Sequence, residues 1–143
     1  MGGWGTYGFS IGAYDEANTR TEKLHAISRN LRSTAYGLDE SLATGWSDHD
    51  VAQLHDLAQH IHAAASAAEP SLIAVELDDE TMRSLHLATV GAVQALYLGV
   101  EERHVENSIF VARRVVEAYD AIQNRAPHRA IAMLRSVTEQ EKA

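Results

Sequence analysis

The chain contains no cysteine among its 143 residues. This absence excludes disulfide bonds, thiolate zinc sites and cysteine nucleophiles, and it fits a reducing compartment. Only two prolines occur, Pro70 and Pro127, so long stretches of the chain are free to be helical. The first residues also lack the basic and apolar regions of a secretory signal. We therefore expect a cytoplasmic protein.

Long apolar runs are missing as well. The most apolar segment, Leu87–Val100, is 14 residues long and still contains Thr89, Gln94 and two glycines. A helix that spans a membrane needs about 20 consecutive apolar residues. The sequence therefore predicts a buried core helix here and no membrane partner.

Basic residues are absent from the middle of the chain. Between Arg32 and Arg83 there is no lysine or arginine, whereas ten acidic residues lie there. This block accounts for the formal net charge of −8. Such a surface repels nucleic acid and anionic membranes and attracts basic proteins or cations. We expect no nucleic-acid partner and consider a basic protein a candidate partner.

The periodicity of the apolar residues divides the chain in two. Residues 1–17 are rich in glycine and aromatic residues, and Tyr7, Phe9 and Ile11 alternate with small residues. A period of two predicts an extended or flexible N-terminal arm. From residue 18 to residue 143 the period is helical, which indicates one helical-bundle domain.

The predicted fold is all-α, an up-and-down bundle of about five helices with the extended N-terminal arm. The first helix is expected from about residue 19, after a cap at Thr19 or Thr21, to Gly45. The others are expected at 47–69, 79–102, 105–124 and from Pro127 onward. Residues 71–77 are compatible with a short strand or an apolar connector.

The expected helix 79–102 is apolar nearly all round. Its apolar residues are Met82, Leu85, Leu87, Val90, Val93, Leu96, Leu98 and Val100. Either it is the central helix of the bundle, or it buries a second face against another copy of the chain. Small residues, such as Ala92 and Gly99, would let another helix approach it closely.

Two E-x-x-H motifs suggest metal ligands, Glu22 with His25 and Glu101 with His104. In ferritin-like bundles such pairs project inward from two helices and hold a di-iron centre with further carboxylates. Here one motif opens the first helix and the other closes the third. These helices run parallel in an up-down bundle, so we expect the motifs about 30 Å apart. Only a swapped dimer would bring them together.

The expected helix 47–69 carries further candidate ligands. His55 and His62 share one side of it with Gln59, and Asp56 lies four residues before His60 on the solvent side. Imidazoles spaced along a helix can chelate a divalent transition metal, and acidic surroundings favour a cation. The alternative is that these histidines pack at the edge of the core with one nitrogen in water.

Two N-terminal motifs do not carry a function. The G-x-G-x-x-G at residues 3–8 lacks the preceding strand and following helix that dinucleotide binding requires. Residues 1–6 fit the short myristoylation pattern, which such brief segments often match by accident.

The sequence favours binding over catalysis. The leading hypothesis is a non-enzymatic helical module that binds protein, either a second copy of itself in a homo-oligomer or a basic partner, with no cofactor. The alternative is a divalent transition metal bound by His55 and His62, or by the E-x-x-H residues. A helical enzyme with a site between helices is neither supported nor excluded.

Overall fold

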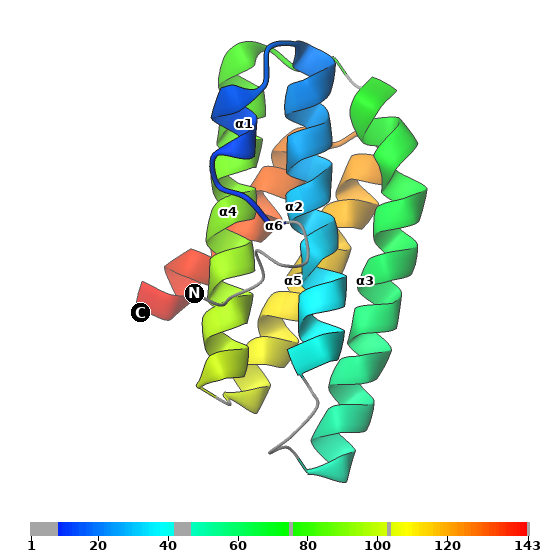
Figure 1. Cartoon of the computed structure of the whole chain (residues 1–143), viewed down its shortest axis with the longest axis vertical. Helices are drawn as coiled ribbons and strands as arrows, with labels where there is room; N and C mark the ends of the chain where they lie inside the picture. Colours follow the sequence, from blue (N-terminus) through cyan, green and yellow to red (C-terminus); the bar gives the residue numbers. More distant parts are fainter. Residues whose placement is uncertain (1–8, 42–46, 75, 103, 143) are drawn as a thin grey trace.

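The computed structural model describes residues 9–41, 47–74, 76–102 and 104–142. Over these residues the protein is all-α, as predicted, with no strand. The helices are α1 (Ala13–Glu16), α2 (Arg20–Ser41), α3 (Asp48–Ala74), α4 (Asp79–Glu101), α5 (Val105–Gln123) and α6 (Pro127–Lys142). The direction of the chain alternates from α2 to α6, which confirms the up-and-down bundle (Figure 1).

Side-chain caps begin three of the helices, two of them at the predicted capping residues Thr19 and Ser47 and the third at Asp78, in the predicted acidic first turn. Thr19 Oγ1 accepts a hydrogen bond of 3.1 Å from the backbone N–H of Glu22, at the start of α2. Ser47 does the same for Asp50, at 3.2 Å, and Asp78 for Thr81, at 2.7 Å. These bonds satisfy backbone donors that the first turn of a helix leaves without an intrahelical partner.

The predicted end of α3 at Glu69–Pro70 is wrong. The helix continues through Pro70 to Ala74, so residues 71–74 form neither a strand nor a connector. A proline inside a helix costs about 3 kcal/mol because a hydrogen bond is lost. Leu72, in the added turn, is only 3% exposed. Burying a leucine contributes about 1.5–3 kcal/mol, which offsets most of that cost.

The predicted N-terminal arm lies partly outside the described residues, which begin at Phe9. Within the described part, Ala13–Glu16 form the short helix α1, whereas the sequence predicts an extended segment there. Tyr14 is 4% exposed and belongs to the hydrophobic core. Its burial holds this turn against the bundle, and the pattern of alternating residues gives no sign of it.

Helix α2 lies between α3 and α4, with α5 and α6 behind them (Figure 1). Helix α3 packs against α2 and α5, whereas α4 packs against α2, α5 and α6. Helix α4 is therefore not enclosed by the other helices, although the sequence allowed it to be the central one. Among the described residues, no helix is long and apolar enough to cross a membrane.

One hydrophobic core joins the predicted apolar faces of all five long helices. Its largest fully buried side chains are Leu24, Ile27, Leu31, Leu38, Leu54, Ile61, Leu85, Leu96, Leu134, Val93, Val111 and Val115. Small residues of α4 are buried too, including Ala92 at 0% exposure. At Gly99, an added Cβ would come within 2.9 Å of the Ser108 hydroxyl oxygen on α5. The short connection from α4 to α5 depends on this close approach.

We predict that Gly99→Val lowers the free energy of unfolding by about 1–3 kcal/mol, the usual cost of overpacking a filled interior. Ser108 is fully buried and donates to the His104 carbonyl at 2.9 Å, so it has little room to move. Urea unfolding at fixed protein concentration, followed by circular dichroism, measures the change. Ala67→Val, at an exposed position of α3, is the matched control and should stay within about 0.5 kcal/mol.

Candidate functional site

The structure places the two E-x-x-H motifs at opposite ends of the bundle. Glu22 and His25 lie in the first two turns of α2, and Glu101 ends α4 just before His104. Helices α2 and α4 run in the same direction, so the two pairs lie apart, as the sequence predicted (Figure 1).

Each of these four residues has a local structural role. Glu22 completes the cap of α2, where its Oε1 lies 3.2 Å from the Thr19 hydroxyl. Glu101 accepts a hydrogen bond of 3.4 Å from the Tyr97 hydroxyl. His104 precedes α5, and its carbonyl accepts hydrogen bonds of 2.9 Å from both the backbone N–H and the hydroxyl of Ser108. His25 lies 3.9 Å from Glu69 of α3.

The histidines of α3 face water. His55 and His62 are both exposed, seven residues and therefore about 10.5 Å apart along the helix. The His62 ring packs edge-on against Tyr36 of α2, with ring centres 5.6 Å apart, beside a shallow groove of about 240 Å³. His60 and Asp56 form the predicted pair, 3.6 Å apart. In the part of the chain that the structure describes, no three histidine, aspartate or glutamate side chains are grouped to share a metal ion. The metal assignment stays a prediction.

The acidic block of the sequence is divided in space. Asp48, Asp50 and Asp56 lie in the first turns of α3. Glu76 and the acidic residues 78–80 lie beyond its other end. Asp56 lies 18 residues before the end of α3 at Ala74, so about 27 Å of helix separates the two groups. Between them, Glu69 binds Arg32 of α2 and contributes no free negative charge.

Glu69 is the centre of a polar cluster inside the bundle. It accepts hydrogen bonds from the Arg32 guanidinium and, at 3.4 Å, from the Ser28 hydroxyl. The Tyr119 hydroxyl of α5 is buried and has no hydrogen-bond partner among the described residues. Burial raises the pKa of Tyr119 well above its usual value, and nearby Arg32 opposes this effect only in part. Glu69 thus joins α2 to α3 through Arg32 and Ser28, whereas the buried Nε atom of Arg32, like the Tyr119 hydroxyl, has no hydrogen-bond partner among the described residues.

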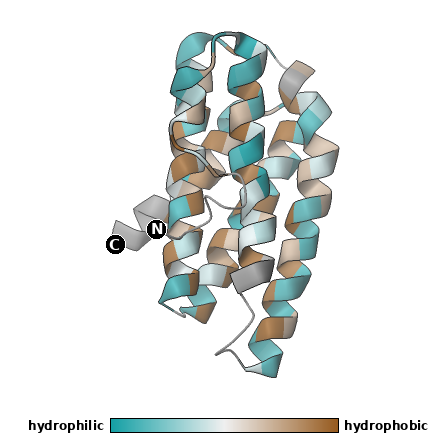
Figure 2. Cartoon of the chain, viewed as in Figure 1, coloured by the Kyte–Doolittle hydropathy of each residue, from teal (hydrophilic) through white to brown (hydrophobic). Residues whose placement is uncertain are grey.

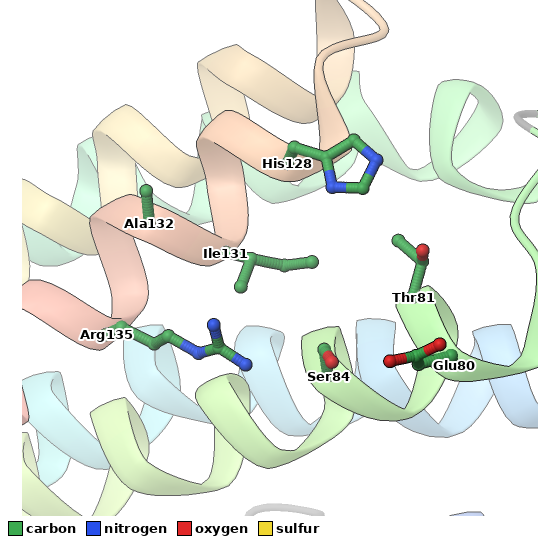
Figure 3. Close-up of a pocket in the computed structure, with 7 residues that line it drawn as sticks. All are labelled: Glu80, Thr81, Ser84, His128, Ile131, Ala132 and Arg135. Carbon is green, nitrogen blue, oxygen red and sulfur yellow. The ribbon is translucent and has the colours of Figure 1, made fainter.

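A groove of about 390 Å³ lies between the N-terminal halves of α4 and α6 (Figure 3). His128 and Arg135 of α6 point into it, opposite Glu80, Thr81 and Ser84 of α4, with Ile131 between them (Figure 3). The three ionisable side chains are exposed and carry both signs of charge. Exposed charges of opposite sign interact only weakly, and together they favour neither an anion nor a cation as a ligand. The groove is open and electrostatically mixed.

The segment 9–17, here called the N-terminal strap, is fastened to α2 and α4. The amide of the fully buried Asn30 holds the backbone of Ser10 at two points, accepting from its N–H at 2.8 Å and donating to its carbonyl at 3.0 Å. Lys23 donates to the Tyr14 carbonyl at 3.0 Å. Asp15 lies 3.8 Å from Arg83 of α4.

The strap covers His86, the only buried histidine among the described residues. The rings of Tyr14 and His86 stack, with centres 4.2 Å apart and planes within 9° of parallel. His86 Nδ1 is buried and has no hydrogen-bond partner within the described part of the chain. Burial lowers the pKa of His86; Asp15 opposes this shift, whereas Arg83 and Lys23 add to it. Periodicity and local motifs give no sign of this pair because the two residues are 72 positions apart in the sequence.

The outer face of α4 is the largest departure from a fully covered core. Leu87 is 54% exposed and Leu98 is 47% exposed. They lie on one stripe of the helix, with Gly91 and Gln94 between them. Hydrophobic residues recur along α4 in Figure 2, whereas its first turn is hydrophilic. The helix thus presents a narrow apolar stripe to water, beside the strap on one flank and α6 on the other.

No family model matches this sequence, and no curated protein or solved structure is significantly similar to it.

We predict that acid weakens the fold through His86. An unfolded histidine titrates near pH 6.5. Because the folded pKa is lower, the unfolded chain binds a proton that the folded chain does not, as the pH falls below about 6.5. Stability should therefore decline from about pH 6.5 downward, until the folded pKa is reached. His86→Phe keeps the ring stack, so its stability should fall less over this range.

Urea unfolding between about pH 8 and pH 5 measures this difference, because histidines titrate in that interval. His49→Phe, at an exposed position in the first turn of α3, removes one imidazole as a control. The same decline in His86→Phe as in the natural sequence would contradict the role of His86.

We also predict that Glu69→Ala lowers the free energy of unfolding by about 1–2 kcal/mol, because it leaves the half-buried Arg32 without its carboxylate. Glu76→Ala removes an exposed carboxylate near the same end of α3 and should change stability by less than about 0.5 kcal/mol. Equal losses in the two variants, measured by thermal unfolding, would show that the cluster around Glu69 is not stabilising.

Proposed function

We propose that this protein is a non-enzymatic interaction module that self-associates through the outer face of α4. The observation that carries the proposal is the exposure of Leu87 and Leu98 on one stripe of a helix whose other faces are packed. Removing apolar surface from water contributes about 25 cal/mol per Å², so a matching apolar face stabilises a complex. A second copy of the chain offers such a face.

The composition of the stripe supports a protein partner. Gly91 and Gln94 lie between the leucines, so the middle of the face is uncharged, while Arg83 and Glu101 lie beyond the leucines at its two ends. A centre depleted of charge with a polar rim is the usual anatomy of a protein interface. Among the described residues, two other large apolar side chains are exposed, Ile11 on the strap and Tyr36 on α2.

A basic partner has less support than a second copy. The acidic residues lie toward the two ends of α3, about 27 Å apart at the nearest, and Glu69 between them is already paired with Arg32. A basic protein would meet two small acidic groups. Exposed ion pairs contribute at most about 1 kcal/mol each, less than a buried leucine side chain.

Light scattering at micromolar concentration tests self-association. We expect a mass of twice the 15.7 kDa chain. The double variant Leu87→Ser and Leu98→Ser should raise the dissociation constant at least a hundredfold, because each leucine contributes about 1.5–3 kcal/mol and 1.4 kcal/mol is tenfold.

The matched control is Tyr36→Ser, which removes an exposed large side chain from α2. It should leave the mass unchanged, and circular dichroism should show that all variants stay helical. A monomeric natural protein at these concentrations, or a dimer that the double variant leaves intact, would refute the proposal.

A further inference from the structure

We infer that the partner on this face is a second copy of the chain whose α4 runs antiparallel to the first, with Arg83 of each subunit beside Glu101 of the partner subunit. The inference rests on the proposed function and adds the direction and register of the pairing. It follows from the order of residues along the exposed stripe of α4, from Arg83 through Leu87, Gly91, Gln94 and Leu98 to Glu101.

The order of residue types along the stripe is almost unchanged when the direction of the helix is reversed. Its midpoint lies between Ala92 and Val93, with Leu87 and Leu98 at equal distances on either side. When two such helices lie antiparallel about that midpoint, Leu87 of one subunit meets Leu98 of the other. Gly91 then lies opposite Gln94, so the residue without a side chain faces the longer one. Apolar contacts and side-chain size therefore agree on one register.

The charged residues at the two ends of the stripe determine the relative direction of the paired α4 helices. Arg83 and Glu101 are 18 residues apart, which is five turns of 3.6 residues, so both lie on the same side of the stripe. In a symmetric antiparallel pair, this geometry brings each Arg83 next to Glu101 of the partner subunit, twice per dimer. A parallel pair would place Arg83 against Arg83 and Glu101 against Glu101, where like charges repel.

Both charged side chains are available for this contact. The Arg83 side chain is 63% exposed, and its ion pair with Asp15 is 3.8 Å long between two exposed groups. Glu101 is exposed and, among the described residues, accepts a long hydrogen bond from Tyr97 of its own helix, at 3.4 Å. Neither contact fixes its side chain firmly, since exposed pairs of this kind are weak.

Disulfide cross-linking tests the direction, because the natural chain has no cysteine. Leu87→Cys and Leu98→Cys are made as separate proteins, one of them isotopically labelled, then mixed and mildly oxidised. A disulfide requires Cβ atoms about 4 Å apart. In the antiparallel pair the mixed disulfide should dominate the intact-mass spectrum, and each variant alone should cross-link poorly.

Charge reversal provides an independent readout. Arg83→Glu and Glu101→Arg should each weaken dimerisation about tenfold at low salt, since each replaces two attractive contacts per dimer with repulsive ones. The double variant should recover the natural dissociation constant. Arg113→Glu, at an exposed position on α5, is the matched control and should have no effect.

The outcomes separate the two proposals. Efficient cross-linking of Leu87→Cys to itself, or additive weakening in the double charge variant, would overturn the antiparallel pairing while the dimer, and with it the proposed function, would stand. A monomer in light scattering together with no cross-link in any mixture would overturn both.

Discussion

The position of α4 in the bundle determines which apolar side chains remain in water. Helices α3 and α4 are consecutive in the chain, yet they lie on either side of α2 (Figure 1). Helix α3 therefore cannot cover the outer face of α4. Helix α6 covers one flank and the strap covers the other, through Tyr14 on His86. The stripe with Leu87 and Leu98 remains between them.

The strap, on one flank of this face, lies over the imidazole ring of His86. The Tyr14 ring stacks on the buried His86, and Tyr14 is held by contacts of its own backbone and ring with Lys23. Removing an imidazole from water favours its neutral form, and a Nδ1 atom without a partner adds to the cost of burial. At this edge of the α4 face, burial of the His86 ring in the core therefore disfavours its protonation.

Features that depend on residues close together along the chain could be predicted from the sequence. Helical periodicity and the capping residues Thr19 and Ser47 located the helices, and the topology of the bundle placed the two E-x-x-H motifs at opposite ends. The sequence was insufficient where distant residues meet. The extension of α3 depends on a core site for Leu72, the Arg32–Glu69 pair joins two helices, and the Tyr14–His86 stack depends on how the strap docks.

The polar groups inside the bundle and in the groove differ in character from the outer face of α4. Glu69 accepts hydrogen bonds from Arg32 and Ser28, and the groove of Figure 3 is lined by the exposed side chains of Glu80, His128 and Arg135. A catalytic site needs groups held ready for a substrate, usually in a sheltered pocket. On the outer face of α4, by contrast, Leu87 and Leu98 are exposed, and Arg83 and Glu101 near the two ends of the helix carry opposite charges. In the pairing that we propose, a face with opposite charges at its two ends would meet a second copy of itself in the antiparallel direction. Self-association is thus the function that the exposed side chains support most directly.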